Sequence, residues 1–244
     1  MTTNNLPLFY KNPVMLDKQV HANTSLTNKL SFAFASKVNA VPVSIVELPN
    51  VMQFYPIAFS SQAPATPLAI LGLRENENLF VDDKGNWLEN TYVPAYIRRY
   101  PFIFAADETG EKLTLCVDDS EGILEKNTQN PLFAPDGELT DLTKNALEFC
   151  RSYQGAAEQT LGFSEAIEKS GILLERHAEA RLNNGEVITL SGFRQVDENK
   201  FYELPKETIL EWHDKRWSGF IYAHLLSIGN WQRLFQLLEK RKAN

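Results

Sequence analysis

Short runs rich in apolar residues, separated by Pro, Gly and Asn, dominate the chain between residues 13 and 120. Such runs, bounded by turn-forming residues, are typical of β-strands. The turn formers of Asp82–Asn86 lie between two of these runs and predict a hairpin. The predicted strands are Val41–Val46, Tyr55–Phe59, Leu68–Leu73, Leu79–Val81, Phe102–Ala105 and Leu113–Val117.

From Thr140 the apolar positions recur at intervals of three and four, which is the period of an amphipathic helix. Thr140 is the predicted N-cap, Asp141 suits the positive end of the helix dipole, and Gly162 is the predicted end. The apolar positions of this stripe are Leu142, Ala146, Leu147, Cys150, Tyr153, Ala157 and Leu161.

The strand pattern returns in two runs, Leu173–Leu182 and Val187–Phe193, joined through Asn183–Gly185. Its Asn-Gly pair is a strong hairpin signal. A further turn at Asp197–Asn199 leads into Phe201 and Tyr202, which predicts a three-stranded meander.

The tail of the chain has a helical pattern from Pro205, a residue well suited to the first position of a helix. Gly229 is expected to break it, which predicts a C-terminal helical hairpin. The sequence thus predicts an α+β fold with a mixed or antiparallel β-rich core and one long central helix. We expect a single domain over residues 1–244, with a strand-rich half (13–120), a helix plus β-meander (138–204) and a helical tail (205–244).

The charge and cysteine content exclude several classes of function. With 31 acidic and 24 basic residues, the formal net charge of −7 disfavours binding to nucleic acid or anionic lipid. Cys116 and Cys150 form no CxxC pair, so we expect reduced thiols rather than a zinc or disulfide framework. The first residues lack the features of a signal peptide, and no apolar stretch approaches the roughly 20 residues of a membrane span. We therefore expect a cytoplasmic protein without membrane insertion.

Four sequence blocks resemble the SapC-like family of bacterial proteins, which is named after a protein associated with surface layers. The blocks are Phe54–Phe59, Ala69–Arg74, Asn78–Val81 and Tyr92–Phe102, with weaker similarity in Leu190–Leu204 and Ala223–Leu234. The resemblance implies a role linked to the export or modification of surface-layer (S-layer) proteins. It implies no catalytic residues.

A metal site is one candidate for chemistry. His177 and Glu179 would project from the same face of a strand, and His224 as a third ligand would complete the two-histidine, one-carboxylate set of non-haem iron enzymes. Against this, Arg176 and Arg181 flank the pair and indicate a solvated charged face. We expect the three side chains to lie apart, with no metal and no cofactor.

The segment Tyr92–Phe102 is the stronger candidate for a binding site. Tyrosines and prolines surround the adjacent pair Arg98 and Arg99, and an arginine can bind a carboxylate through two parallel hydrogen bonds. The two prolines disfavour a regular strand or a long helix, so we expect a stiff, irregular connection. The alternative is that the aromatic residues belong to the core and the arginines pair with surface acids. The candidate ligand-binding residues are Tyr92, Tyr96, Arg98, Arg99 and Tyr100.

No catalytic or nucleotide-binding motif occurs in the chain, which favours a non-enzymatic accessory protein with a peptide or protein partner. Two alternatives stay open. One is a metal-dependent, peptide-modifying oxygenase that uses His177 and Glu179. The other is a structural subunit of a complex, held through the helices between Trp212 and Leu238. The sequence does not indicate the oligomeric state.

Overall fold

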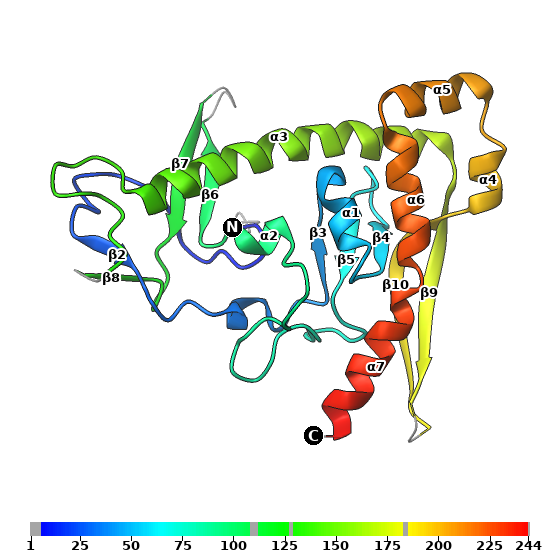
Figure 1. Ribbon diagram of the computed structural model, residues 1–244, viewed down its shortest axis with the longest axis horizontal. Helices are drawn as coiled ribbons and strands as arrows, with labels where there is room; N and C mark the ends of the chain where they lie inside the picture. Colours follow the sequence, from blue (N-terminus) through cyan, green and yellow to red (C-terminus); the bar gives the residue numbers. More distant parts are fainter. Residues whose placement is uncertain (1–5, 108–111, 127–128, 183–184, 244) are drawn as a thin grey trace, which may run out of the picture. The chain divides into compact units, whose positions relative to one another are not determined.

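The α+β class is confirmed by a computed structural model, which describes residues 6–107, 112–126, 129–182 and 185–243 (Figure 1). The chain forms two compact units. Unit 1 comprises residues 1–31 and 97–155, and unit 2 comprises residues 32–96 and 156–244. That the two units fold as one domain stays a prediction.

Unit 1 contains two small antiparallel sheets. In the first, β7 (Leu113–Asp118) lies between β1 (Pro13–Met15) and β6 (Phe102–Ala106). In the second, β2 (Thr24–Leu26) pairs with β8 (Leu124–Lys126). Strands β6 and β7 lie where the apolar runs predict them. Strands β1, β2 and β8 are three residues long, too short to produce a readable alternation.

The core of unit 1 lies between the β6–β7 sheet and the first half of the long helix α3 (Asp141–Ser170). The hydroxyl oxygen of Thr140 accepts a long hydrogen bond of 3.4 Å from the Thr143 N–H, as expected of an N-cap. Cys150 is buried in this core, in agreement with its place on the predicted apolar stripe. The buried residues of the cluster are Phe102, Leu115, Val117, Leu132, Phe133 and Cys150.

The predicted end of the long helix is wrong. The helix continues through Gly162 to Ser170, and the next residue, Gly171, has a left-handed φ of 70° that ends it. An isolated glycine weakens a helix by only about 1 kcal/mol. Here burial of Phe163 and Ile167, both fully inaccessible to solvent, outweighs that cost.

Unit 2 is organised around a five-stranded antiparallel sheet in the order β3-β5-β4-β10-β9. Its strands are β3 (Ala40–Pro42), β5 (Pro67–Ile70), β4 (Ile57–Ser60), β10 (Val187–Val196) and β9 (Leu173–Arg181). The shorter elements of the unit are the 3₁₀ helices η1 (Phe32–Ala35) and η2 (Ile45–Glu47) and the helix α1 (Leu48–Val51).

The predicted strands of this unit are shorter than expected: Leu68–Leu73 ends at Ile70 as β5, and Tyr55–Phe59 begins at Ile57 as β4. Only the beginning of Val41–Val46 is a strand, because Ser44 and Glu47 form a capping box that starts η2. The run Leu79–Val81 forms one isolated bridge, between Val81 and Trp87, on either side of the predicted turn. The turn itself is present, since the Asp82 N–H donates to the Asn86 carbonyl.

The predicted three-stranded meander is also wrong. After β9 and β10 the chain enters a short helix, α4 (Glu198–Tyr202), in place of a third strand. The carboxylate of Asp197 caps this helix by accepting hydrogen bonds from the Asn199 and Lys200 N–H groups. Of the predicted hairpin turn, Asn183 and Asn184 lie outside the described residues.

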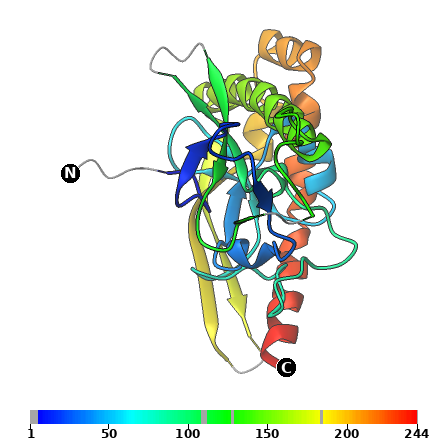
Figure 2. The same cartoon turned by 90° about the vertical axis from the view of Figure 1, so that its left-hand side faces the viewer.

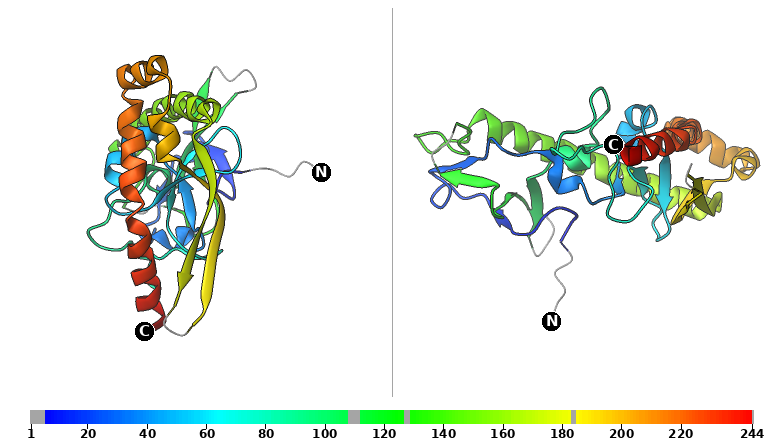
Figure 3. Two further views of the ribbon diagram at one scale, coloured as in Figure 1. Left: turned by 90° about the vertical axis from the view of Figure 1, so that its right-hand side faces the viewer. Right: turned by 90° about the horizontal axis from the view of Figure 1, so that it is seen from below.

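The tail is helical, as predicted, with α5 (Lys206–Asp214), α6 (Trp217–Ser227) and α7 (Asn230–Ala243). Pro205 directly precedes α5, and Gly229 lies in the break between α6 and α7. Helices α6 and α7 follow one another along the β9–β10 hairpin (Figure 3). The free end of α7 and the distal end of the hairpin reach the same end of the unit (Figure 2).

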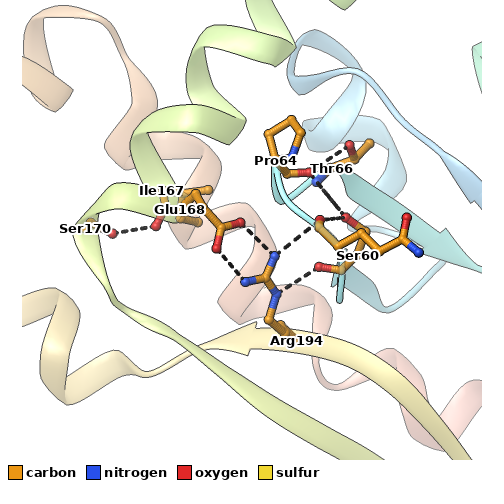
Figure 4. A network of polar contacts seen from close by, with 8 residues as sticks. Ser60, Pro64, Thr66, Ile167, Glu168, Ser170 and Arg194 are labelled. Carbon is orange, nitrogen blue, oxygen red and sulfur yellow. Dashed lines mark hydrogen bonds and ion pairs between the residues drawn. The ribbon is translucent and has the colours of Figure 1, made fainter.

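One ion pair joins the end of α3 to the sheet (Figure 4). Both terminal nitrogens of Arg194, on β10, donate to the carboxylate of Glu168 at 2.8 Å. Its Nε donates to the Ser60 carbonyl on β4, also at 2.8 Å. The hydrogen bonds from Arg194 lower the pKa of Glu168 below its ordinary value. This bidentate contact holds α3 over the β4–β10 pair.

Candidate functional site: an arginine beside a small cavity

The segment Tyr92–Phe102 is irregular apart from one helical turn, α2 (Ala95–Arg98). Pro94 and Pro101 are both buried. The segment therefore has the form that its two prolines predict. Tyr92 and Tyr96 belong to unit 2, and the residues from Ile97 onward belong to unit 1.

In unit 2 the segment is anchored by a buried carboxylate, that of Glu47, which is only 4% exposed. One of its oxygens accepts a hydrogen bond of 2.8 Å from the Tyr92 hydroxyl and one of 2.9 Å from the Ala95 N–H. The other accepts from the Ser44 N–H at 2.9 Å. Three donors thus compensate the burial of Glu47. Tyr92 acts here as a structural anchor, and Tyr96 is likewise buried.

In unit 1 the two arginines have different surroundings. Arg99 lies over two tyrosine rings, with its guanidinium carbon 4.5 Å from the centroid of Tyr153 and 5.7 Å from that of Tyr10. Arg98 is exposed and lies over Phe149, at 5.1 Å. Such cation–π contacts orient a guanidinium through its flat faces. The rings of Tyr10 and Tyr153 thus orient the guanidinium of Arg99.

Tyr100 completes the anchoring in unit 1. Its ring is buried and lies edge-on to that of Tyr10, with the centroids 5.3 Å apart. Burial, and then the nearby carboxylate of Asp118, raise the pKa of Tyr100 to about 12. The phenol is therefore protonated at neutral pH, and its role beside Arg99 is one of packing.

A cavity of about 120 Å³ opens beside Arg99. Arg98 does not line it. Its volume is well below the roughly 300 Å³ at which drug-sized ligands begin to fit, so it suits a single carboxyl or amide group. The lining residues are Pro7, Arg99, Ile103, Phe104, Cys150, Tyr153 and Gln154.

The chemistry of this cavity is that of binding. Arg99 and Gln154 carry the polar groups suited to a carboxylate, and Ile103 and Phe104 form apolar walls. Burial raises the pKa of the Cys150 thiol to about 11, against the opposing effect of the Arg99 charge. The thiol is thus protonated at neutral pH, which makes it a poor nucleophile.

Sequence reasoning identified Arg99 but missed the residues that hold it. Tyr10 comes from the start of the chain, and the helical period predicts for Tyr153 only a place on the apolar stripe. The one usable signal was the position of Tyr153, one helical turn from the buried Cys150 on the same face.

The structure does not bring the candidate metal ligands together as a set. His177 and Glu179 are exposed on β9, whereas His224 is fully buried in α6. Both ring nitrogens of His224 contact the backbone: Nδ1 lies 2.9 Å from the Ile57 carbonyl oxygen, and Nε2 accepts a 3.1 Å hydrogen bond from the Val196 N–H. Among the described residues, no group of three potential metal ligands is close enough to hold an ion.

A second, larger cavity of about 560 Å³ lies in unit 2, between the end of α3 and the helices α5 and α6. No motif in the sequence indicates this cavity. The Lys215 ammonium contacts Glu211 at 2.6 Å and lies 4.5 Å from the ring centroid of Trp217. Because Glu165 and Lys169 also line the cavity, both signs of charge are present and no ligand class is selected.

Together, the fold and the site define a two-unit α+β protein with an arginine oriented by tyrosines at a small cavity. The SapC family model matches residues 16–234, and the chain therefore belongs to the SapC family. No curated protein and no solved structure matches the chain. None of the helices in the described residues is long and apolar enough to cross a membrane.

Proposed function

We propose that this protein is a non-enzymatic, cytoplasmic accessory protein that binds a carboxylate of a peptide or protein partner at Arg99. The observation that carries the proposal is the position of Arg99, over the rings of Tyr10 and Tyr153 and at the wall of a small cavity. Membership of the SapC family supports a partner connected with surface-layer proteins, acting in their export or modification.

The geometry suits a carboxylate for two reasons. The aromatic rings contact the flat faces of the guanidinium, whereas a carboxylate binds along its N–H edge. The anchors of the segment, Tyr92 and Tyr96 in unit 2 and Tyr100 in unit 1, also fix its backbone before binding. A rigid site avoids the entropy cost of ordering a loop around the ligand.

A single acidic side chain or a chain terminus matches the size of the cavity. Hydrogen bonds to a charged group contribute roughly 1.5 to 3 kcal/mol, which corresponds to about 10- to 150-fold in affinity. Lysine keeps the charge but lacks the planar fork. Arg99→Lys should therefore weaken binding within that range. Because lysine also loses part of the stacking on Tyr10 and Tyr153, the melting temperature should fall by a few degrees at most, and binding is measured well below it.

Arg98→Lys is a matched control, because Arg98 is the neighbouring residue, also lies over an aromatic ring and does not line the cavity. We would tag the full chain in its native cell at the endogenous level and compare the proteins captured by wild type, Arg98→Lys and Arg99→Lys. A partner retained by wild type and Arg98→Lys, but lost from Arg99→Lys, would support the proposal.

The captured partner would then supply the peptides for calorimetric titration. Each peptide would be tested with its acidic side chains intact or converted to amides, and with its C-terminal carboxyl free or amidated. One of these changes should weaken binding to wild type as much as Arg99→Lys does. Equal binding by wild type and Arg99→Lys would show that the partner is recognised elsewhere.

A further inference from the structure

The two edge strands of the five-stranded sheet in unit 2, β3 and β9, differ in length and in proline content. At one edge, β3 is three residues long and ends in Pro42, which has no N–H to donate. At the other edge, β9 runs for nine residues without proline or glycine. Proteins usually blunt exposed strand edges with short strands, proline, bulges or charged side chains, and of these devices β9 has only the charges. The bulge in the hairpin lies on β10, between Leu190 and Phe193.

The hydrogen bonds of the hairpin show which backbone groups of β9 point outward. The Leu182 N–H donates to the Glu186 carbonyl, and the Ile172 carbonyl accepts from the Asp197 N–H. Even-numbered residues of β9 thus bond to β10, because inward and outward groups alternate along an antiparallel strand. The N–H and C=O groups of the odd-numbered residues face away from β10, and within the described residues no strand pairs with that side.

The odd-numbered side chains carry a self-complementary charge pattern. Glu175, His177, Glu179 and Arg181 are all exposed, and on a strand they share one face. If two copies of β9 pair antiparallel about Ala178, Glu175 lies opposite Arg181 of the other copy. In the same register His177 lies opposite Glu179. The two-fold axis repeats each contact, which gives four favourable cross-strand pairs.

Neighbouring registers lack this complementarity. Pairing about His177 places Glu175 opposite Glu179 twice, and pairing about Glu179 places Glu179 against its own copy and His177 opposite Arg181. Like charges directly opposite each other on paired strands are destabilising. Of the registers centred on His177, Ala178 and Glu179, pairing about Ala178 is therefore the one that the charges favour, and it also pairs more of β9 than a register centred nearer the end of the strand.

We propose that β9 is a dimer interface, at which a second copy of this chain pairs antiparallel about Ala178 and extends the five-stranded sheet through both copies. Ala178 then meets its own copy in a non-hydrogen-bonded pair, where the strands approach most closely and a small side chain fits best. On the face of the even-numbered residues, the half-buried Leu174 lies opposite the buried Leu182 of the other copy, with the exposed Arg176 between Leu174 and Ala178.

Charge reversal tests this register directly in the full chain. Glu175→Arg alone places two arginines opposite each other at both ends of the interface, and Arg181→Glu alone places two glutamates there. Each single variant should weaken dimerisation at least about tenfold in sedimentation experiments. The double variant E175R/R181E restores both opposite-charge pairs and should dimerise like wild type.

An equimolar mixture of the two single variants provides a second test. In a mixed dimer, positions 175 and 181 are both arginine in one copy and both glutamate in the other. Every cross-strand pair between these positions then joins opposite charges, so the mixture should form a heterodimer although neither variant dimerises well alone. Arg181 is exposed, so Arg181→Glu should fold like wild type in circular dichroism. Glu175 is exposed but lies opposite Arg194 on β10, so the urea unfolding of Glu175→Arg is compared with that of wild type, and the double variant controls for any local effect of this substitution.

Crosslinking locates the contact independently of charge. Ala178→Cys should form a disulfide-linked dimer on oxidation, because the two copies of this residue lie directly opposite each other in the proposed register. Ser191→Cys is the matched control, since Ser191 lies on the inner strand β10, and it should not crosslink.

Several outcomes would overturn the proposal. A wild-type chain that remains monomeric at about 100 μM, roughly the upper limit for a useful association, has no such interface. Single variants that dimerise like wild type, or a double variant as weak as the singles, would exclude this register. Efficient crosslinking through Ser191→Cys rather than Ala178→Cys would place the contact elsewhere.

Discussion

Acidification should destabilise unit 2 through one buried histidine, His224. The carbonyl of Ile57 can only accept a hydrogen bond, so Nδ1 of His224 carries the proton. The N–H of Val196 can only donate, so Nε2 must be unprotonated. The side chain is therefore a neutral imidazole of defined tautomer, and it bridges β4 and β10 beyond the point where the two strands pair. A proton added at Nε2 would point at the Val196 N–H and break the bridge.

The size of the effect follows from the pKa of His224. Burial lowers it from 6.5 to about 4, against the opposing effect of the hydrogen bond to Ile57. The unfolded chain therefore binds the proton more readily than the folded chain does. The difference corresponds to about 3 kcal/mol, at about 1.4 kcal/mol for each pH unit. This stability is complete above pH 6.5 and is lost as the pH falls towards 4.

The four tryptophans of the chain, Trp87, Trp212, Trp217 and Trp231, all belong to unit 2 and make fluorescence a selective assay. Urea unfolding followed by tryptophan emission should give a free energy of unfolding at least about 2 kcal/mol lower at pH 4.5 than at pH 7. Carboxylates whose pKa is lowered in the fold, such as Glu168, act mainly below this range. Between pH 6.5 and 4.5 the change in the free energy of unfolding therefore reports mainly on the protonation of His224.

Two variants sharpen the test. His224→Gln retains a donor and an acceptor but does not titrate, so its stability should be nearly constant across the window. His213→Gln removes an exposed histidine of the same unit and should behave like wild type. If His224→Gln is too unstable to measure, an NMR titration of the His224 ring in wild type gives the pKa directly. A ring that titrates near 6.5 would refute the reasoning, as would equal acid sensitivity of wild type and His224→Gln.

The remaining predictions concern glycine-to-alanine substitutions and the reactivity of the two cysteines. A Cβ at Gly72 would lie 2.1 Å from the Glu77 carbonyl oxygen, so Gly72→Ala should cost about 3 kcal/mol. Gly162→Ala meets nothing within 4 Å and should add up to about 1 kcal/mol in the same urea assay. Cys116 and Cys150 are free and buried, so a thiol reagent should react slowly with the native chain and count two thiols after denaturation. A count of zero would contradict the structure.

The sequence predicted best where one period persists over many residues. The long helix α3 and the tail helices α5 and α7 show such a period, because one face of each is buried. Helix α6 is apolar on all sides and has no such period. The errors occurred where a local interaction decided the outcome. The carboxylate of Asp197 converts the expected third strand into α4, and the capping box of Ser44 and Glu47 ends a predicted strand early. Short side-chain caps of this kind produce no periodicity.

The candidate site was only half predictable for a related reason. An arginine pair among tyrosines and prolines is visible along the sequence, which singled out Arg98 and Arg99 together. The two arginines differ in their tertiary contacts: Tyr10 and Tyr153 contact Arg99, and Phe149 contacts Arg98. Tyr153 and Phe149 lie one turn apart on α3, so the helix presents a different ring to each arginine. The cavity beside Arg99 arises from the same tertiary contacts.

The two proposed surfaces lie in different units, and this makes them experimentally separable. Arg99 belongs to unit 1, whereas Glu175 and Arg181 belong to unit 2. If each surface acts independently, Arg99→Lys should lose the partner and keep the dimer, and Glu175→Arg should lose the dimer and keep the partner. A Glu175→Arg variant that also loses the partner would mean that the partner needs two copies of the site at once. Linked sites gain avidity through effective concentration, so that loss should then be recovered in the charge-swapped double variant, which restores the dimer without altering Arg99.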